Sequence, residues 1–484
     1  MQGTSRYVAK PIVGWAQLAA ALAAGLVLRL VFVHFYGQTQ GDSLLYGDIA
    51  KNLLQHGVFG LNRSSGVTPT LLRLPGYPLF LVACFKTFGM EHYRAVMLVQ
   101  CALDLGTCAL AAGTAARLWG RQAGVWTLWL AALCPFTANY VATALTETPT
   151  LFCIALAFYA LTRWRTAANG AALGLDRFFW MMAGALAYAI LLRPDGGLLA
   201  AAVVPAVALL AWHHREREED PPATKANAAG ITIVLCLAIL APLVPWTYRN
   251  LHQFHVIEPL APRYATDPGE MVTYGFNHWY RSWGIDFAST EDVFWNMNEA
   301  EIQIEDIPTR AFDNDEQYDA TDKLLRDYNQ TTTLTPEMDY RFQLLADARK
   351  RANPMRYYLV LPVARLVNML LRPRTEILPV ALEWWQYKKH PAQTVFALGY
   401  AVLNFFYFAA AGLGAWAACR RLPREQLIVI YAMLAYVVMR SLLLMTMDNA
   451  EERYTLEFLP LAFVLAGSFC SRVCDKEEPS GGLW

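Results

Sequence analysis

Residues 11–36 read PIVGWAQLAAALAAGLVLRLVFVHFY, and residues 41–48 follow as GDSLLYGD. A mostly apolar run of this length is what a helix needs to cross about 30 Å of hydrocarbon, so it predicts a membrane span. Asp42 and Asp48 come a few residues after that span, and Glu147 stands at a second junction between polar and apolar sequence. This pattern predicts carboxylates held at the edge of a bilayer.

Composition extends this interpretation to the whole chain. Hydrophobic residues make up 56% and charged residues 17%, and long apolar runs recur, which predicts an all-α polytopic membrane protein. The first run is too long for a signal-peptide core and has no convincing cleavage site after it, so we expect a retained span. About ten spans are expected, at 12–36, 94–117, 122–141, 147–162, 178–192, 196–212, 229–246, 394–418, 426–446 and 456–471.

The basic residues of the connections predict the orientation. By the positive-inside rule, the connections rich in Lys and Arg lie in the cytoplasm, together with both termini. These residues are Arg6, Lys10, Arg117, Arg121, Arg163, Arg165, Arg215, Arg217, Lys225, Arg420, Arg421, Arg424, Arg472 and Lys476. The loops expected on the outer side are 37–93, 142–146, 193–195, 247–393 and 447–455, so Asp42 and Glu147 are predicted to emerge on one face.

Three regions follow from this topology. Residues 1–246 form a transmembrane core with the first outer loop 37–93, residues 247–393 form an outer region, and residues 394–484 hold the last spans and a cytoplasmic tail. In the outer region acidic residues outnumber basic ones, and Thr335-Pro336-Glu337 predicts a capped helix start. The segment 354–372 is interrupted by Pro362 and Arg365 and predicts an interfacial helix, with an eleventh span as the alternative.

Six segments then resemble a known family in order. They are DSLLYGDIAKNLLQHG (42–57), RLPGYPLF (73–80), TALTETP (143–149), LLRPDG (191–196), PWTYRN (245–250) and EERYTLEFLP (451–460). The chain resembles polyprenyl-phosphate-sugar-dependent glycosyltransferases of the GT-C fold, especially bacterial relatives of dolichyl-phosphate-mannose protein mannosyltransferases and of the lipid A aminoarabinose transferase. The resemblance implies a GT-C bundle with outer juxtamembrane helices and an inverting reaction. It fades across 265–340 and around 375–395.

The chemistry of sugar transfer from a lipid phosphate assigns roles to these segments. The reaction needs a base for the acceptor proton and cations for the leaving phosphate. Asp42 is predicted as the base, with Glu147 as the second catalytic acid. Arginine binds phosphate through forked hydrogen bonds, so the predicted donor site comprises Arg73, Tyr77, Arg193, Arg453 and Tyr454. No metal-ligand spacing stands out and no cofactor is expected, although dependence on a divalent cation stays open.

Charges inside the predicted spans indicate structure as well as function. Arg29 and Asp104 lie at matched depths, which predicts a structural ion pair, and Arg440 is expected to line the donor cavity. The sequence therefore predicts a hexosyl- or pentosyltransferase of the cytoplasmic membrane that acts on its outer face. Its partners would be a polyprenyl-phosphate sugar, a glycan, lipid or protein acceptor and the bilayer, but not nucleic acid. A transporter or flippase of lipid-linked glycans, or a glycan polymerase or ligase, remains an alternative.

Overall fold

A computed structural model describes residues 14–39, 41–164, 175–215 and 221–475. The chain divides into two compact units. The first comprises Met1–Ala261, Phe406–Tyr436 and Glu457–Trp484, and the second comprises Pro262–Phe405 and Val437–Leu456.

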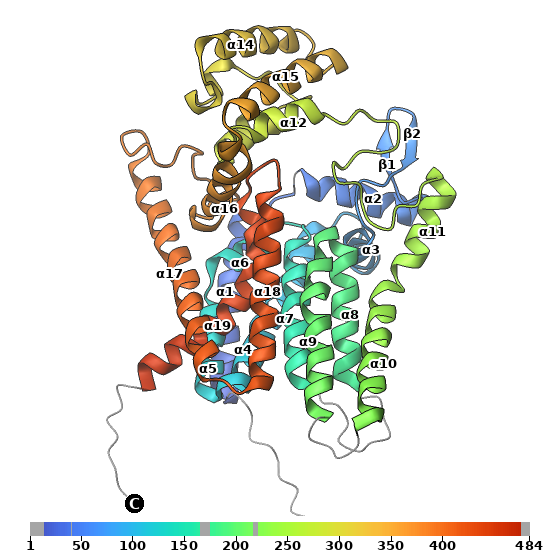
Figure 1. Cartoon of the computed structure of the whole chain (residues 1–484), viewed down its shortest axis with the longest axis vertical. Helices are drawn as coiled ribbons and strands as arrows, with labels where there is room; N and C mark the ends of the chain where they lie inside the picture. The colour runs from blue at the N-terminus through green and yellow to red at the C-terminus, as the bar shows by residue number, and fades with distance from the viewer. Residues whose placement is uncertain (1–13, 40, 165–174, 216–220, 476–484) are drawn as a thin grey trace, which may run out of the picture. The chain divides into compact units, whose positions relative to one another are not determined.

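The first unit is mainly a bundle of long helices (Figure 1). Its elements up to residue 261 are α1 (Trp15–Tyr36), α2 (Asp42–His56), β1 (Gly60–Arg63), β2 (Gly66–Pro69), α3 (Gly76–Phe88), α4 (Tyr93–Trp119), α5 (Arg121–Ala132), α6 (Pro135–Tyr140), α7 (Glu147–Arg163), α8 (Arg177–Leu192), α9 (Gly197–Arg215), α10 (Pro221–Leu240) and α11 (Leu243–Phe254). Parts of α17 (Pro391–Arg421) and α18 (Arg424–Met445) also belong to it, as does α19 (Leu459–Asp475).

The helices coincide with the predicted apolar segments, but the expected count of about ten spans is not confirmed. Within the described residues, six helices are long and apolar enough to cross a membrane, or seven if the α10–α11 pair, bent by 41°, is one span. The segments predicted at 147–162 and 178–192 form helices of 17 and 16 residues. At 1.5 Å per residue these helices are shorter than the ~30 Å hydrocarbon layer. The segment 122–141 is interrupted between α5 and α6.

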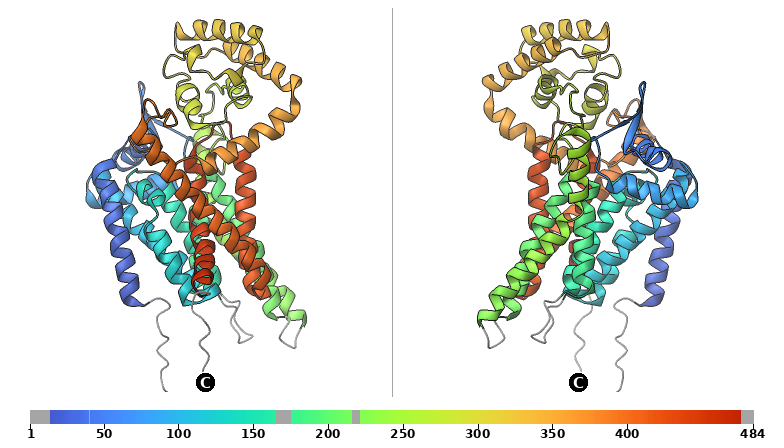
Figure 2. Two further views of the ribbon diagram at one scale, coloured as in Figure 1. Left: turned by 90° about the vertical axis from the view of Figure 1, so that its left-hand side faces the viewer. Right: turned by 90° about the vertical axis from the view of Figure 1, so that its right-hand side faces the viewer.

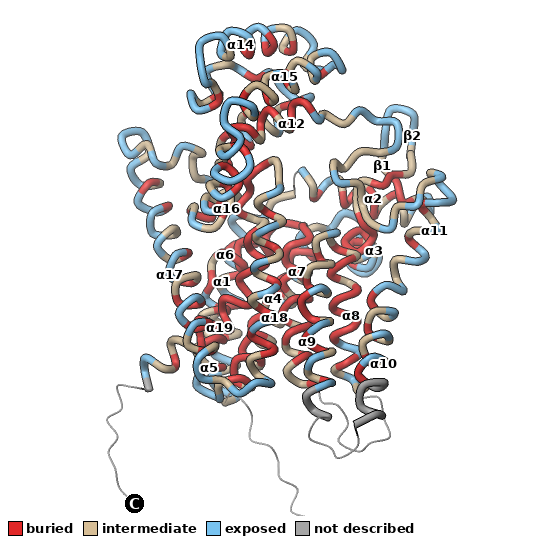
Figure 3. The backbone as a smooth tube through the Cα atoms, viewed as in Figure 1, coloured by how far each residue is buried: buried red, intermediate tan, exposed pale blue. Residues whose placement is uncertain are grey.

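The interior of the bundle is closely packed. Helix α4 packs against α5 and α7, and α19 packs against α5. Small residues make this approach possible: a Cβ atom added to Gly467 would lie 2.0 Å from Thr127 Oγ1. The predicted Arg29–Asp104 pair is confirmed, because Arg29 Nε donates to Asp104 Oδ2 at 2.8 Å and both side chains are buried. Figure 3 shows how continuous the buried residues are along these helices.

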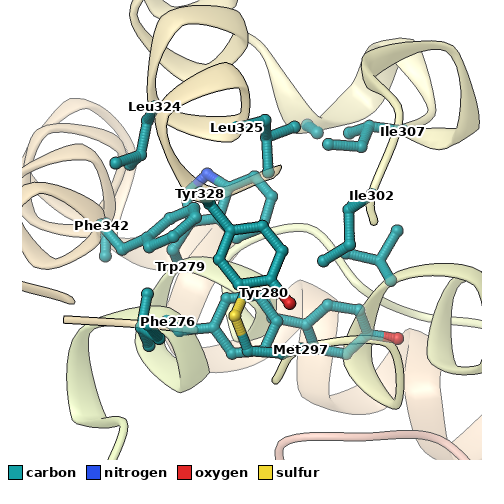
Figure 4. Close-up of a cluster of buried hydrophobic side chains, with 14 of the residues drawn as sticks. Phe276, Trp279, Tyr280, Met297, Ile302, Ile307, Leu324, Leu325, Tyr328 and Phe342 are labelled. Carbon is teal, nitrogen blue, oxygen red and sulfur yellow. The ribbon is translucent and has the colours of Figure 1, made fainter. Parts of the chain in front are cut away.

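The second unit contains a separate helical core. Its helices are α12 (Tyr274–Arg281), α13 (Phe287–Ser289), α14 (Asp315–Asn329), α15 (Pro336–Ala352) and α16 (Leu361–Leu371), with short 3₁₀ or π-helical turns at Thr290–Phe294, Ile304–Asp306, Thr309–Ala311 and Arg356–Val360. Helices α12 and α15 pack together, and the elements from α12 to α15 stay together in both turned views (Figure 2). Buried aromatic rings fill the space between them, including Trp279, Tyr280, Tyr328 and Phe342 (Figure 4).

Local sequence signals explain where the helices of the second unit begin. Thr335 Oγ1 accepts a hydrogen bond from Met338 N at 3.3 Å, which confirms the predicted capped start of α15. Asn314 caps α14 in the same way. Helix α16 has 11 residues and is not among the candidate spans of the described chain. Its placement in the membrane interface stays a prediction.

Candidate active site

Asp42 begins α2 immediately after Gly41, whose φ of 56° is easily adopted by glycine. Its carboxylate accepts a hydrogen bond from Arg73 Nη2 at 2.7 Å. Arg73 precedes α3, so the pair joins two elements of the first unit. The Asp42 side chain is 30% exposed and that of Arg73 is 22% exposed. Asp42 is therefore oriented by a cation and still reachable from solvent.

A backbone bridge brings the segment that leads to Glu147 close to the one that leads to Asp42. Gln38 pairs with Thr143 in an isolated parallel bridge, and Gln38 N donates to Ala142 O at 3.0 Å. Gln38 follows α1 and Thr143 precedes α7. The two predicted acids thus start from segments that are hydrogen-bonded to each other.

Tyr77 and Gln100 stabilise this bridge through a chain of hydrogen bonds. Tyr77 OH donates to Gln100 Oε1 at 2.8 Å, and Gln100 Nε2 donates to Thr143 O at 2.7 Å. Both side chains are completely buried. Because the Tyr77 hydroxyl is already bonded to Gln100, its first role in this structure is to position the Thr143 segment.

Arg193 lies among three carboxylates. It contacts Glu147 at 3.3 Å, Asp195 at 3.1 Å and Glu457 at 3.5 Å. Tyr436 OH also donates to Glu457 Oε2 at 2.6 Å. The Glu147 side chain is only 3% exposed, so Arg193 supplies the positive charge that such a buried carboxylate needs.

Tyr46 links the Asp42–Arg73 pair to the Glu147–Arg193 pair. The Arg73 guanidinium lies 5.6 Å from the Tyr46 ring centroid. Burial raises the pKa of the Tyr46 hydroxyl to about 12, and the charges of all four residues also act on that pKa. The two ion pairs therefore belong to one cluster around a buried tyrosine.

The remaining predicted residues, Arg453 and Tyr454, belong to the second unit. Arg453 pairs with Glu451, and Tyr454 OH donates to Glu451 Oε1 at 2.5 Å. Arg440, expected to line the donor cavity, donates to Tyr454 O at 2.8 Å. These contacts stabilise the segment that leads into the 3₁₀ helix Glu452–Phe458.

The structure adds three groups that the sequence did not indicate: Gln100, Asp195 and Glu457. Asp195 follows Arg193 by two residues in LLRPDG, so the motif itself held a signal for the pair. Gln100 lies within an apolar helix and had no local signal, whereas Glu457 lies inside the motif 451–460 but far along the chain from Arg193. In the described part of the chain, no group of three or more His, Cys, Asp or Glu side chains is arranged to hold a metal ion.

Comparisons with known proteins match this architecture. Residues 73–246 match the sequence model of the dolichyl-phosphate-mannose-protein mannosyltransferase family, a range that includes Arg73, Tyr77, Glu147 and Arg193. The oligosaccharyltransferase AglB of Archaeoglobus fulgidus, solved with an inhibitory peptide and a dolichol-phosphate, has a TM-score of 0.51 and 11% identity to the chain. The chain has a GT-C fold.

This GT-C protein aligns with AglB over 95% of its own length but only 50% of the AglB chain, so it spans about half of AglB. ArnT from Cupriavidus metallidurans, solved with undecaprenyl phosphate, has a TM-score of 0.36 and 13% identity, over 95% of this chain and 78% of that one. A TM-score this low gives no further support to the assignment of the fold. None of the curated proteins is detectably similar in sequence. The GT-C fold that the motifs predicted is therefore confirmed.

Proposed function

We propose that this GT-C protein transfers a sugar from a polyprenyl-phosphate donor to an acceptor, with inversion at the sugar carbon. The cluster formed by Asp42, Arg73, Glu147 and Arg193 around Tyr46 carries this proposal. It combines carboxylates that can accept a proton with guanidinium groups that can bind phosphate. The matched family is named for mannosyl transfer and AglB for oligosaccharyl transfer, which supports the same reaction class.

Asp42 is the proposed base because of its exposure. An acceptor hydroxyl must reach the base directly or through one water molecule, and Asp42 is ten times more exposed than Glu147, at 30% against 3%. Glu147 is held by Arg193, so its proposed role is to fix that guanidinium and to orient the acceptor. Direct attack by the activated hydroxyl needs one base and no covalent intermediate, which gives inversion.

The phosphate of the donor is assigned to Arg73 and Arg193 in the first unit. Within the first unit, four carboxylates face two guanidinium groups: Asp42, Glu147, Asp195 and Glu457 against Arg73 and Arg193. An anionic donor therefore needs more positive charge than this cluster supplies. Arg453, in the motif 451–460, stays a predicted phosphate ligand, and in the second unit it pairs with Glu451.

The proposed orientation places this cluster on the outer side of the cytoplasmic membrane. In the first unit, α2 and the start of α7 lie at the opposite end of the bundle from the α4–α5 connection (Figure 1). Arg117 near the end of α4 and Arg121 at the start of α5 flank that connection, and the positive-inside rule assigns such residues to the cytoplasm.

Mass spectrometry of glycolipids and glycoproteins from cells that lack the protein tests the proposal. We expect one sugar to be missing, and wild-type protein should restore it. The Asp42→Asn variant should not restore it, because loss of a general base typically costs about 10²–10⁴-fold in rate. Glu91→Gln is the matched control, since it removes only a partly exposed ion pair with Lys51. Full restoration by Asp42→Asn at wild-type expression would refute the assignment of the base.

A further inference from the structure

Helix α11 contains the motif PWTYRN (245–250), to which the proposed reaction assigns no role. The preceding helix α10 has 20 residues, or about 30 Å, which is the thickness of the hydrocarbon layer. Pro242 follows it, and α10 and α11 are bent by 41° at this break. Figure 1 shows that α11 lies at the end of the bundle where α2 and the β1–β2 hairpin are found. Helix α11 therefore begins near the membrane surface.

One face of α11 is apolar and exposed. Val244, Tyr248 and Leu251 are 66%, 70% and 44% exposed, and their spacing of four and three residues puts them on one side of the helix. Exposed apolar residues with the same spacing form a stripe on α10: Ile233, Leu237 and Leu240. Pro242 keeps helical dihedral angles, with φ −67° and ψ −18°, so the stripe continues across the bend. The side of α10 that faces lipid is thus extended onto α11.

The other face of α11 is bound to the first outer loop. Arg249 Nη2 donates to Phe59 O at 2.7 Å, and Arg249 Nη1 donates to Thr70 O at 3.0 Å. Phe59 and Thr70 flank the β1–β2 hairpin, so one guanidinium holds both of its ends. The guanidinium also lies 5.2 Å from the ring centroid of Phe59 and 5.1 Å from that of Trp246. A planar fork that donates to two carbonyl groups and stacks on aromatic rings is a role suited to arginine.

A small buried cluster connects α11 with the segments that carry the Asp42–Arg73 pair. Its members come from α11, α2 and the loop between them in space: Trp246, Ile49, Phe59 and Leu74. Ile49 lies in the helix that begins at Asp42, and Leu74 follows Arg73 in the chain. The rings of Phe59 and Trp246 pack edge to face with their centroids 4.9 Å apart. A displacement of α11 would therefore also displace the loop that carries this pair.

We infer that α11 docks on the bilayer surface through Val244, Tyr248 and Leu251, and that Arg249 couples the docked helix to the first outer loop. The partner is the boundary between lipid headgroups and acyl chains, because the stripe continues the lipid-facing side of α10. Tyrosine is enriched at this boundary, since its ring is apolar and its hydroxyl is polar. Arg249 is then a positioning residue that fixes the depth of the Asp42–Arg73 pair relative to the membrane. The docking itself does not depend on the proposed transfer reaction.

Photo-crosslinking tests the partner. The photoreactive amino acid p-benzoylphenylalanine replaces Tyr248 in the full-length protein, which is reconstituted into nanodiscs of phosphatidylethanolamine and phosphatidylglycerol without any polyprenyl lipid. After irradiation, mass spectrometry should detect phospholipid adducts on the peptide that contains position 248. The matched control is Tyr340, which is 62% exposed on the polar helix α15 and should give no lipid adduct. Absence of lipid adducts at position 248, or crosslinks from it mainly to a second protein chain, overturns the inference.

Hydrogen exchange tests the coupling in the same nanodiscs. Arg249→Met leaves the stripe intact, so lipid adducts at position 248 should not change, whereas amide exchange across residues 59–70 should accelerate about tenfold, the effect of 1.4 kcal/mol. Arg249→Lys should restore only part of the protection, because it lacks the planar fork. Leu251→Asp places a charge in the stripe and should both reduce the adducts and accelerate exchange.

Tyr340→Asp is the control for Leu251→Asp and should change neither measurement. Melting temperatures show which variants remain folded. The coupling is refuted if residues 59–70 exchange as in wild type in folded Arg249→Met protein, and the docking is refuted if folded Leu251→Asp protein keeps its lipid adducts. Neither measurement requires sugar transfer, so an error in the proposed function would leave both results interpretable.

Discussion

Arg193 contacts three carboxylates, so a substitution at Arg193 affects these ion pairs as well as any bound phosphate. A phosphate that binds its guanidinium must compete with Glu147, Asp195 and Glu457. Arg193→Lys keeps the charge but loses the planar fork, so affinity for free polyprenyl phosphate should fall. Arg193→Met should lower it further, and the same order is expected for Arg453→Lys and Arg453→Met. Binding of polyprenyl phosphate without sugar or acceptor isolates this contact.

Arg326→Met is a suitable control for these variants. Its side chain is 76% exposed and pairs only with Asp322 one helical turn away, so phosphate affinity should not change. Unaltered affinity in both Arg193→Met and Arg453→Met would remove these two residues from the phosphate site. Arg73, which already contacts Asp42, would then be the remaining candidate.

Single residues show where prediction from sequence ends. Asp42, Glu147, Arg73 and Arg193 could be chosen because motifs and junctions mark them. That Arg73 would pair with Asp42 could not be predicted, because their contact depends on the path of the loop between α2 and α3. Glu457 stands in the motif 451–460, but its contact with Arg193 depends on how the segment before α19 packs, and this packing leaves no local pattern in the sequence.

Among the helices, apolar length and capping residues predicted most boundaries. Thr335 marks the start of α15, and α1 covers Trp15–Tyr36 of the predicted apolar run. The β1–β2 hairpin and the break between α5 and α6 were not predicted. The hairpin is held by Asn62, which donates from its backbone to Asp48 at 2.7 Å, so Asp48 has a structural role. Its strands are four residues each, too short for a clear alternating pattern.

Helices α1 and α4 are joined by the Arg29–Asp104 pair, and its removal tests how much a buried charge costs. Arg29→Met or Asp104→Leu alone should destabilise the protein by about 3–5 kcal/mol, because each leaves one buried charge uncompensated. The double replacement should recover most of this loss. Recovery should be incomplete, because Arg29 also donates to Ala132 O at 2.9 Å near the end of α5. Thermal unfolding in detergent measures all three variants.

Additive effects in this double-mutant cycle would contradict the coupling of the two residues. Sugar transfer by the single variants should decrease only as far as their folded fraction decreases. A loss of activity in a fully folded variant would give the pair a catalytic role that its position inside the bundle does not suggest.

For the whole molecule, composition was sufficient to predict the membrane class, and ordered motifs predicted the GT-C fold. The division into two units could not be predicted in this way, because α17 and α18 each contribute residues to both units. A boundary inside a continuous helix cannot be read from apolar runs or turn residues. It depends on which side chains each part of the helix contacts.

The second unit should respond to pH through Asp292. Burial and neighbouring acids raise the pKa of Asp292 from 3.8 to about 6 in the folded protein, so the folded state binds the proton more tightly than the unfolded state. Its ionisation therefore opposes folding, and the resulting loss of stability grows as pH rises through the window between these two values. Asp292→Asn should raise the melting temperature at about pH 8 and have little effect at about pH 4. The difference between variant and wild type at each pH cancels the contribution of the other titrating groups.

Asp319→Asn on α14 is the matched control, because this acid is exposed and its replacement should leave that difference near zero at both pH values. An Asp292→Asn protein with the same melting temperature as wild type at about pH 8 would show that water or mobile ions relieve the charge cluster.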